Sequence, residues 1–229
     1  MGALSTIKLR LRKFQKEMDE CLRVNLRNHE NCQVIAVTKR HPLSVVMDAY
    51  SNGIRHFGES QVQEGVIKVK AAPEDTVWHF IGHLQKNKVR KAIQHFHYIH
   101  SVDSMDLLDR MTRIADDERV TPKVFLQVNL LEIPGRFGFF PEDVRAVLEC
   151  RADYQRLDIV GLMGIKPLEA SVGKLDYFQL LRNTRDHLKM EFPDWPGLLS
   201  SGMSGDFKEA IAMGSNFLRI GTRILGERD

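Results

Sequence analysis

Lys39 is the residue of this sequence whose type and position could most readily do covalent chemistry. It directly follows residues 32–38, a short apolar and β-branched run that is typical of a buried strand. A lysine at the end of such a strand can be partly desolvated, which lowers the pKa of its amine and makes it nucleophilic toward an aldehyde. Taken alone, a lysine in this position is more often solvated than reactive, so Lys39 needs support from elsewhere.

Two turns rich in small residues supply that support. Residues 200–205 read Ser-Ser-Gly-Met-Ser-Gly before an expected helix, and residues 219–222 read Arg-Ile-Gly-Thr before another. Small residues let backbone amides approach an anion, and a helix N-terminus adds a favourable dipole. The first turn alone could equally be a glycine turn in which Ser204 is an ordinary N-cap. Combined with Lys39, the two turns fit a ligand that carries both an aldehyde and a phosphate.

The elements that must position these residues form a regular alternation. We expect strands at residues 32–38, 54–57, 77–81, 98–102, 123–129, 158–163, 198–200 and 216–220. A helix is expected after each strand; the first begins at Pro42, the fourth is capped by Asp103 or Ser104, the fifth opens at Pro141, and the sixth spans about 172–190. An additional amphipathic helix from about Ser5 to Arg27 precedes them all.

This alternation predicts an α/β fold, a single (β/α)8 TIM barrel over residues 1–229 with an extra N-terminal helix. A doubly wound open sheet is the alternative, but such sheets usually have fewer strands and a glycine-rich fingerprint after the first strand. In a barrel the carboxyl ends of the strands form the site, and the last two strands commonly seat a phosphate. Lys39 and the two turns would then meet at one mouth.

Composition excludes several classes of function. The net charge of +3 is too small and too evenly spread to indicate nucleic-acid binding. No apolar run is long enough to cross a bilayer, and no signal peptide is evident. The three cysteines show no paired spacing, which favours a reducing compartment, so we expect a cytoplasmic protein. Gly2 opens a loose myristoylation pattern, to which we give little weight.

Five histidines lie between positions 79 and 100, but their spacings match no tight zinc pattern. No cysteines or paired carboxylates accompany them. We therefore expect no metal site, and we interpret His79 and His100 as hydrogen-bonded histidines on strands, inside the barrel.

Several longer blocks together resemble a known family. They are VIAVTK at 34–39, HFGESQVQE at 56–64, WHFIGHLQKNK at 78–88, QVN at 127–129, GLMGI at 161–165, and LSSGMSGDFKEAIAMGSNFLRIGTRILGERD at 199–229. In this order they are similar to the pyridoxal phosphate homeostasis proteins, the single-domain, alanine-racemase-like group of fold type III. The resemblance covers nearly the whole chain. It implies a cytoplasmic protein that binds pyridoxal 5′-phosphate (PLP).

The resemblance also implies roles for individual residues. Lys39 corresponds to the Schiff-base lysine, and Arg219 to the arginine that faces the pyridine nitrogen of the cofactor. Four further residues would surround the phosphate: Ser200, Ser204, Gly221 and Thr222. The sequence departs from the family at three positions: Ser60 replaces an asparagine, His83 a proline, and Lys86 a serine. We assign no role to His83 or Lys86.

Two functions remain open from the sequence. A racemase needs an acid/base on each face of the substrate carbon. In two-domain relatives the second base is a tyrosine delivered from an added β-domain of a partner subunit, and we expect no such domain in this sequence. A carrier needs only reversible imine formation, so we favour a monomeric PLP carrier or regulator without turnover, with PLP-requiring apo-enzymes as partners. The alternative is a PLP-dependent amino-acid racemase or a related fold-type-III enzyme. A third reading is an aldolase-like enzyme in which Lys39 bonds to the substrate itself.

Overall fold

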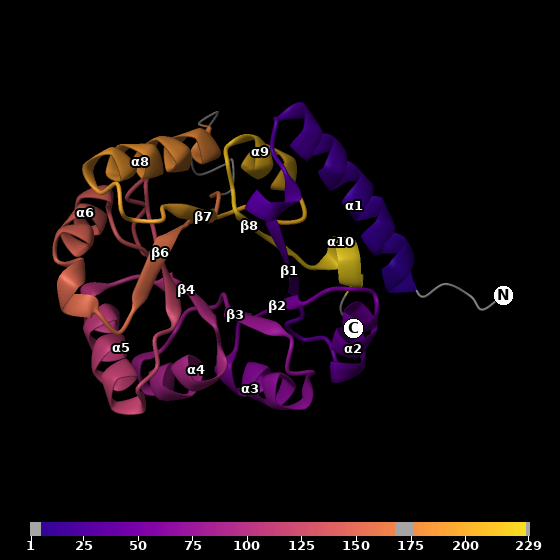
Figure 1. Ribbon diagram of the computed structural model, residues 1–229, viewed down its shortest axis with the longest axis horizontal. Coiled ribbons are helices and arrows are strands. Elements are labelled where there is room, and N and C mark those ends of the chain that lie inside the picture. Colours follow the sequence, from indigo (N-terminus) through magenta and orange to yellow (C-terminus); the bar gives the residue numbers. More distant parts are fainter. Residues whose placement is uncertain (1–5, 168–175, 228–229) are drawn as a thin grey trace.

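Eight parallel strands close into a barrel in the computed structural model, which describes residues 6–167 and 176–227 (Figure 1). The strands follow one another in chain order, and β8 pairs with β1 to close the sheet, with Arg219 opposite Ile35. They are β1 (Gln33–Val37), β2 (His56–Glu59), β3 (Val77–Phe80), β4 (Tyr98–Val102), β5 (Lys123–Gln127), β6 (Asp158–Met163), β7 (Leu198–Ser200) and β8 (Phe217–Ile220). The predicted (β/α)8 barrel is therefore confirmed.

Helices surround the barrel on its outer face (Figure 1). They are α1 (Thr6–Val24), α2 (Leu43–Ser51), α3 (Val62–Ala71), α4 (Val89–His95), α5 (Met105–Glu118), α6 (Pro141–Glu149), α8 (Tyr177–Glu191), α9 (Phe207–Ala212) and α10 (Thr222–Leu225), with short 3₁₀ turns η1 (His29–Asn31), η2 (Lys86–Lys88) and η3 (Arg151–Tyr154). Ser104 caps α5 by accepting a hydrogen bond from the N–H of Leu107, as one of the two predicted caps. Pro42 is the N-cap of α2 rather than its first helical residue. The predicted start of the sixth helix near residue 172 lies outside the described residues.

The predicted N-terminal helix is α1, and it covers a gap in the ring of helices. The last helix, α10, has only four residues, too few to cover β8 and β1. α1 lies along α9 and α10 instead, with every third or fourth residue buried (Figure 1). Phe14 is 1% exposed and its ring lies 5.1 Å from that of Phe207 in α9. α1 thus takes the place of a full-length eighth helix.

The core has two parts. The larger part lies between the strands and the helices, and a smaller cluster fills the barrel, including Ile35, Phe125 and Phe217. His79 and His100 lie among the rings of this inner cluster and are completely buried, which confirms their interpretation as core histidines. Among the described residues, no helix is long and apolar enough to cross a membrane, and no group of three or more His, Cys, Asp or Glu side chains could hold a metal ion.

Candidate functional site

Lys39 lies just beyond the carboxyl end of β1 and is half-buried. The residues on either side of it are fixed. Thr38 is fully buried, its N–H donates to the carbonyl of Gly58 (3.0 Å), and its hydroxyl donates to Oε1 of Glu59 (2.6 Å). Arg40 has a φ of 61°, and the N–H of His41 donates to the carbonyl of Thr38 (3.0 Å). The backbone therefore turns sharply at Lys39, at the mouth where the sequence places it.

A buried ionic cluster braces this turn. The amine of Lys68 donates to the carbonyl of Thr38 (2.8 Å) and to Oε1 of Glu59 and of Glu64 (2.7 Å each). Glu64 Oε1 also accepts the N–H of Arg40 (2.7 Å). Burial raises the pKa of Glu59, and the hydrogen bonds from Lys68 and Thr38 oppose that rise. The cluster thus holds the backbone on both sides of Lys39.

Arg219 is the charged group at the centre of the site. Its side chain is buried on β8, where Nη1 donates to Oγ of Ser200 (2.9 Å) and Nη2 donates to the carbonyl of Gly164 (3.0 Å). Burial lowers its pKa to about 10, so the guanidinium stays protonated at neutral pH. A guanidinium has five N–H donors and no acceptor. Ser200 and Gly164 use two of these donors, and Arg219 keeps its charge at neutral pH.

Ser200 lies behind Arg219. Its hydroxyl is fully buried and contacts Nη1 of Arg219 and Nδ1 of His100 (2.8 Å). The resemblance places Ser200 near a phosphate, whereas the structure gives its hydroxyl these two partners in the barrel interior. Its role as a phosphate ligand stays a prediction, and the contacts favour a role in holding Arg219.

The turn after β7 has a shape that only glycine permits at one position. Gly202 has a φ of 90°, and a Cβ there would lie 2.5 Å from Cβ of Ala210. Oδ1 of Asp206 accepts the N–H of Met203 (2.6 Å) and closes the turn. Asp206, rather than Ser204, is the N-cap residue of α9, so Ser204 is not an ordinary helix cap. The backbone carbonyl of Ser204 accepts a hydrogen bond from Nη1 of Arg223 (3.2 Å).

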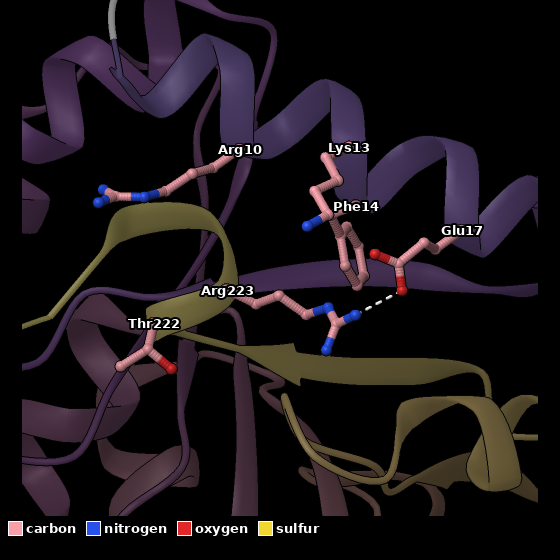
Figure 2. Close-up of a pocket in the computed structure, with 6 residues that line it drawn as sticks. All are labelled: Arg10, Lys13, Phe14, Glu17, Thr222 and Arg223. Atoms are coloured by element: carbon pink, nitrogen blue, oxygen red, sulfur yellow. Dashed lines mark hydrogen bonds and ion pairs between the residues drawn. The ribbon is translucent and has the colours of Figure 1, made fainter.

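The turns after β7 and β8 come together, as the sequence predicts. Ser204 and Thr222 line one cavity of about 440 Å³ together with the basic side chains of Arg10 and Arg223. A neighbouring cleft of about 320 Å³ lies between α1 and α10, where Arg223 also pairs with Glu17 (Figure 2). Gly221 is buried and directly precedes Thr222, the first residue of α10. Two hydroxyl side chains and two guanidinium groups favour an anion here, and Glu227 is the one carboxylate among the lining residues.

Two of the three departures from the family pattern, His83 and Lys86, make side-chain contacts. Nδ1 of His83 lies 3.1 Å from a carboxylate oxygen of Asp103, and its ring stacks on Phe137 at 4.0 Å. Lys86 pairs with Asp106 (2.6 Å) on the surface. The backbone carbonyl of Ser60 lies only 2.1 Å from where a Cβ of Gly82 would be, so the two loops touch through their main chains.

One tyrosine of the site was not expected from the sequence. Tyr177 is the first residue of α8, as predicted to be helical, but its hydroxyl lies 2.9 Å from where a Cβ of Gly164 would be. It is 2% exposed, and burial raises its pKa to about 12. The cluster of Lys68 with Glu59 and Glu64 was also missed. Its only sequence signal is the four-residue spacing of Glu64 and Lys68, which is common on solvated helix faces.

Comparison with known proteins decides the family. The model of the alanine racemase N-terminal domain matches residues 18–229. A pyridoxal phosphate homeostasis protein of Synechocystis sp. is 38% identical over 199 residues, covering 86% of this chain and 91% of the relative. The protein of that name from Homo sapiens is also 38% identical, over 86% of this chain and 77% of its own length. This chain belongs to the pyridoxal phosphate homeostasis protein family.

Solved structures agree with that assignment. PipY of Synechococcus elongatus PCC7942, solved with PLP bound, matches with a TM-score of 0.82 at 39% identity and covers 96% of this chain and 100% of PipY. Alanine racemase of Clostridium difficile matches with a TM-score of 0.69 at 16% identity, so it shows the shared fold alone. The match covers 90% of this chain but 56% of that racemase. The homeostasis protein family thus shares the barrel of the racemases.

Proposed function

We propose that this homeostasis protein binds PLP through the amine of Lys39 and holds it without catalytic turnover, as part of intracellular PLP homeostasis. The observation that carries the proposal is the buried, charged Arg219, held by Ser200 and Gly164 on the strand next to β1. In this arrangement the amine of Lys39 would hold the cofactor by its aldehyde, and Arg219 would donate to its pyridine nitrogen. Ser204, Gly221 and Thr222 surround the phosphate, with Arg10 and Arg223 adding positive charge to that cavity.

The residues present fit this cofactor. A lysine at the end of β1, a donor-only cation on β8 and an anion-favouring cavity after β7 and β8 match its aldehyde, ring nitrogen and phosphate respectively. When bound, the cofactor supplies an electrophilic carbon and an electron-withdrawing ring. Arg219 keeps a proton off the ring nitrogen because it can only donate, and a ring without that proton is a weaker electron sink.

The tyrosines of the chain support a carrier rather than a racemase. Tyr177, with its hydroxyl beside Gly164, remains protonated at neutral pH because burial raises its pKa to about 12, so it is a poor base. The hydroxyl of Tyr50 donates to Asp75, and that of Tyr154 donates to Asp109. Tyr98 is the first residue of β4. Tyr50 lies on α2, the helix that follows Lys39, but its hydroxyl donates to Asp75, so we assign none of these three tyrosines as a second acid/base partner for racemisation.

Two measurements test the proposal. After loading with PLP and removal of free PLP by desalting, the protein is expected to keep a near-visible imine band that Lys39→Ala lacks and the exposed-site control Lys86→Ala retains. The loaded protein is then incubated with L-alanine or L-serine. Chiral chromatography is expected to show no D-enantiomer above the amount that free PLP alone produces. A colourless protein fraction after desalting would refute PLP binding, whereas clear turnover would replace the carrier with a racemase.

The partners and location follow from this function. We propose that the protein is a cytoplasmic monomer that exchanges PLP with PLP-requiring apo-enzymes. Sedimentation of the loaded protein at a mass near 26.3 kDa is the expected result.

A further inference from the structure

Three histidines form a continuous line through the inside of the barrel and end at Arg219. Nδ1 of His56 on β2 lies 2.9 Å from Nε2 of His79 on β3, and Nδ1 of His79 lies 2.9 Å from Nε2 of His100 on β4. Nδ1 of His100 lies 2.8 Å from Oγ of Ser200, which accepts a hydrogen bond from Arg219. We call His56, His79, His100 and Ser200 the histidine chain.

The rings of the chain have fixed orientations. His79 stacks on Tyr98 with ring centres 4.6 Å apart and planes 12° apart. His100 stacks on Phe125 in the same way, at 4.5 Å and 13°. Both histidines are completely buried, and a close-packed interior leaves them no room to turn over. Each ring nitrogen therefore keeps the partner that it has in the structure.

The histidines of the chain are neutral near pH 7. Burial lowers the pKa of His79 and His100 well below the usual value, and it lowers the pKa of His56 to about 4. The positive charge of Arg219 acts in the same direction on His100. A neutral imidazole has one N–H donor and one acceptor nitrogen. Each histidine can thus donate to one neighbour in the line and accept from the other.

The charge of Arg219 sets the direction in which the chain donates. Arg219 occupies one lone pair of Ser200 Oγ as a donor, so the hydroxyl hydrogen of Ser200 needs an acceptor elsewhere. Nδ1 of His100 is the acceptor that the described residues provide. If His100 donated to Ser200 instead, the hydroxyl hydrogen of Ser200 would be buried without an acceptor among the described residues. Leaving a buried donor unpaired in this way costs free energy.

The rest of the chain follows from that first bond. His100 accepts at Nδ1 and therefore donates from Nε2 to His79, which in turn accepts at Nδ1 and donates from Nε2 to His56. His56 ends the chain at a cavity of about 450 Å³ on the amino-terminal side of the barrel, which His97 and Lys123 also line. Its remaining Nε2–H faces that partly exposed end.

We infer that the histidine chain is a positioning device for Arg219, in which Ser200 donates to His100, His100 to His79 and His79 to His56, with all three rings as Nε2–H tautomers. The chain holds the Ser200 hydroxyl so that its free lone pair faces Nη1 of Arg219, and this leaves the other N–H groups of Arg219 directed at the ligand. The benefit to ligand binding rests on the proposed function, in which that ligand is PLP. The tautomers themselves do not depend on it.

Two-bond ¹H–¹⁵N correlation spectra of histidine side chains in the apo-protein test the direction directly. His56, His79 and His100 are each expected to show the pattern of a neutral Nε2–H ring at pH 7, assigned by single substitution of each histidine. The exposed His187, which pairs with Glu191 on α8, serves as the surface control. An Nδ1–H ring at His100, or a charged ring at His79 or His100, would overturn the inference.

Binding of a cofactor analogue tests what the chain does for Arg219. We compare the dissociation constants of PLP and of its analogue with carbon in place of the ring nitrogen, and use their ratio as the readout. His100→Leu is expected to reduce the wild-type preference for PLP by about 3- to 10-fold, the worth of one hydrogen bond, as is Ser200→Ala. Tyr98→Phe keeps the ring that stacks on His79 and is expected to leave the ratio unchanged.

The outcomes separate this inference from the proposed function. A clear wild-type preference that survives both His100→Leu and Ser200→Ala would contradict the positioning role. Absence of binding, or a wild-type ratio of one, would refute the proposed contact of PLP with Arg219, while the tautomer pattern would still decide the direction of the chain. If His100→Leu fails to fold, Ser200→Ala carries the test.

Discussion

At the scale of single residues, Lys39 owes its position to charges that lie around it rather than to the strand alone. Lys68 is 6% exposed in its side chain, and Glu59 is completely buried, so their ion pair is removed from water. Breaking a buried pair by deleting one partner is strongly destabilising, because the other charge stays buried. The backbone turn at Lys39 depends on the same pair.

The first prediction concerns this pair. Lys68→Met is expected to lower the free energy of unfolding by about 3–5 kcal/mol, because Glu59 is then buried without its counter-charge. Urea unfolding of the apo-protein measures the change. Lys70→Met, on the exposed side of α3, is the matched control and is expected to stay within about 0.5 kcal/mol of the wild type. A loss of unfolding free energy in Lys68→Met as small as that in Lys70→Met would show that the ion pair is unimportant.

The histidines of the barrel interior give the second prediction, on pH dependence. The folded state keeps His79 and His100 neutral, with pKa values well below 6.5, whereas the unfolded chain binds protons there as the pH falls below that value. The unfolded state thus binds more protons, so stability is complete above pH 6.5 and is lost as the pH falls. Each histidine is expected to contribute a slope of about 1.4 kcal/mol per pH unit below 6.

Unfolding free energies between pH 8 and pH 5 measure this slope. His79→Phe is expected to reduce it by the share of one histidine, whereas His187→Gln, on the exposed face of α8, is expected to leave it unchanged. A slope that is the same in the wild type and in His79→Phe would contradict the neutral, buried state of His79.

At the scale of elements, the turn between β7 and α9 depends on a left-handed glycine. The third prediction is that Gly202→Ala weakens PLP binding and lowers stability by about 1–3 kcal/mol, because alanine is strained at a φ of 90° and its Cβ would clash with Ala210. Isothermal titration with PLP and thermal unfolding measure the two effects. Gly205→Ala, in the same turn, has no atom within 4 Å of its Cβ and is expected to change neither.

The junction of α1 with α9 carries the fourth prediction. Phe14→Ala is expected to cost about 3–5 kcal/mol of unfolding free energy, because it leaves a cavity between α1 and α9. Leu9→Ala, at a side chain that is 53% exposed on the same helix, is expected to cost less than about 0.5 kcal/mol. Similar small losses in both variants would mean that α1 does not act as the missing eighth helix.

At the scale of the whole molecule, the alternation of strands and helices was sufficient to predict the fold. Regular apolar runs such as 158–163 report local burial, which a sequence shows directly. Lys39 and the turns after β7 and β8 could be predicted for the same reason, since a barrel brings the carboxyl ends of its strands to one mouth. The structure places them there, while their contacts with PLP stay predictions.

The contacts inside the barrel were beyond what the sequence could show. Lys68 contacts Thr38, which lies 30 residues away, and His100 contacts Ser200, which lies 100 residues away. Such pairs depend on which side chains the closed barrel brings together, and no local pattern encodes that. Likewise, Tyr177 follows a helical pattern, yet its hydroxyl lies beside Gly164 because α8 packs over the end of β6.

Borohydride trapping tests the central claim most directly. The wild-type protein is mixed with PLP, reduced with sodium borohydride, digested and mapped by mass spectrometry. A single phosphopyridoxyl group on the peptide that contains Lys39 is the predicted result, with Lys39→Ala unlabelled under the same conditions. Reduction that leaves Lys39 unmodified, or that labels another lysine equally in both proteins, would contradict the account.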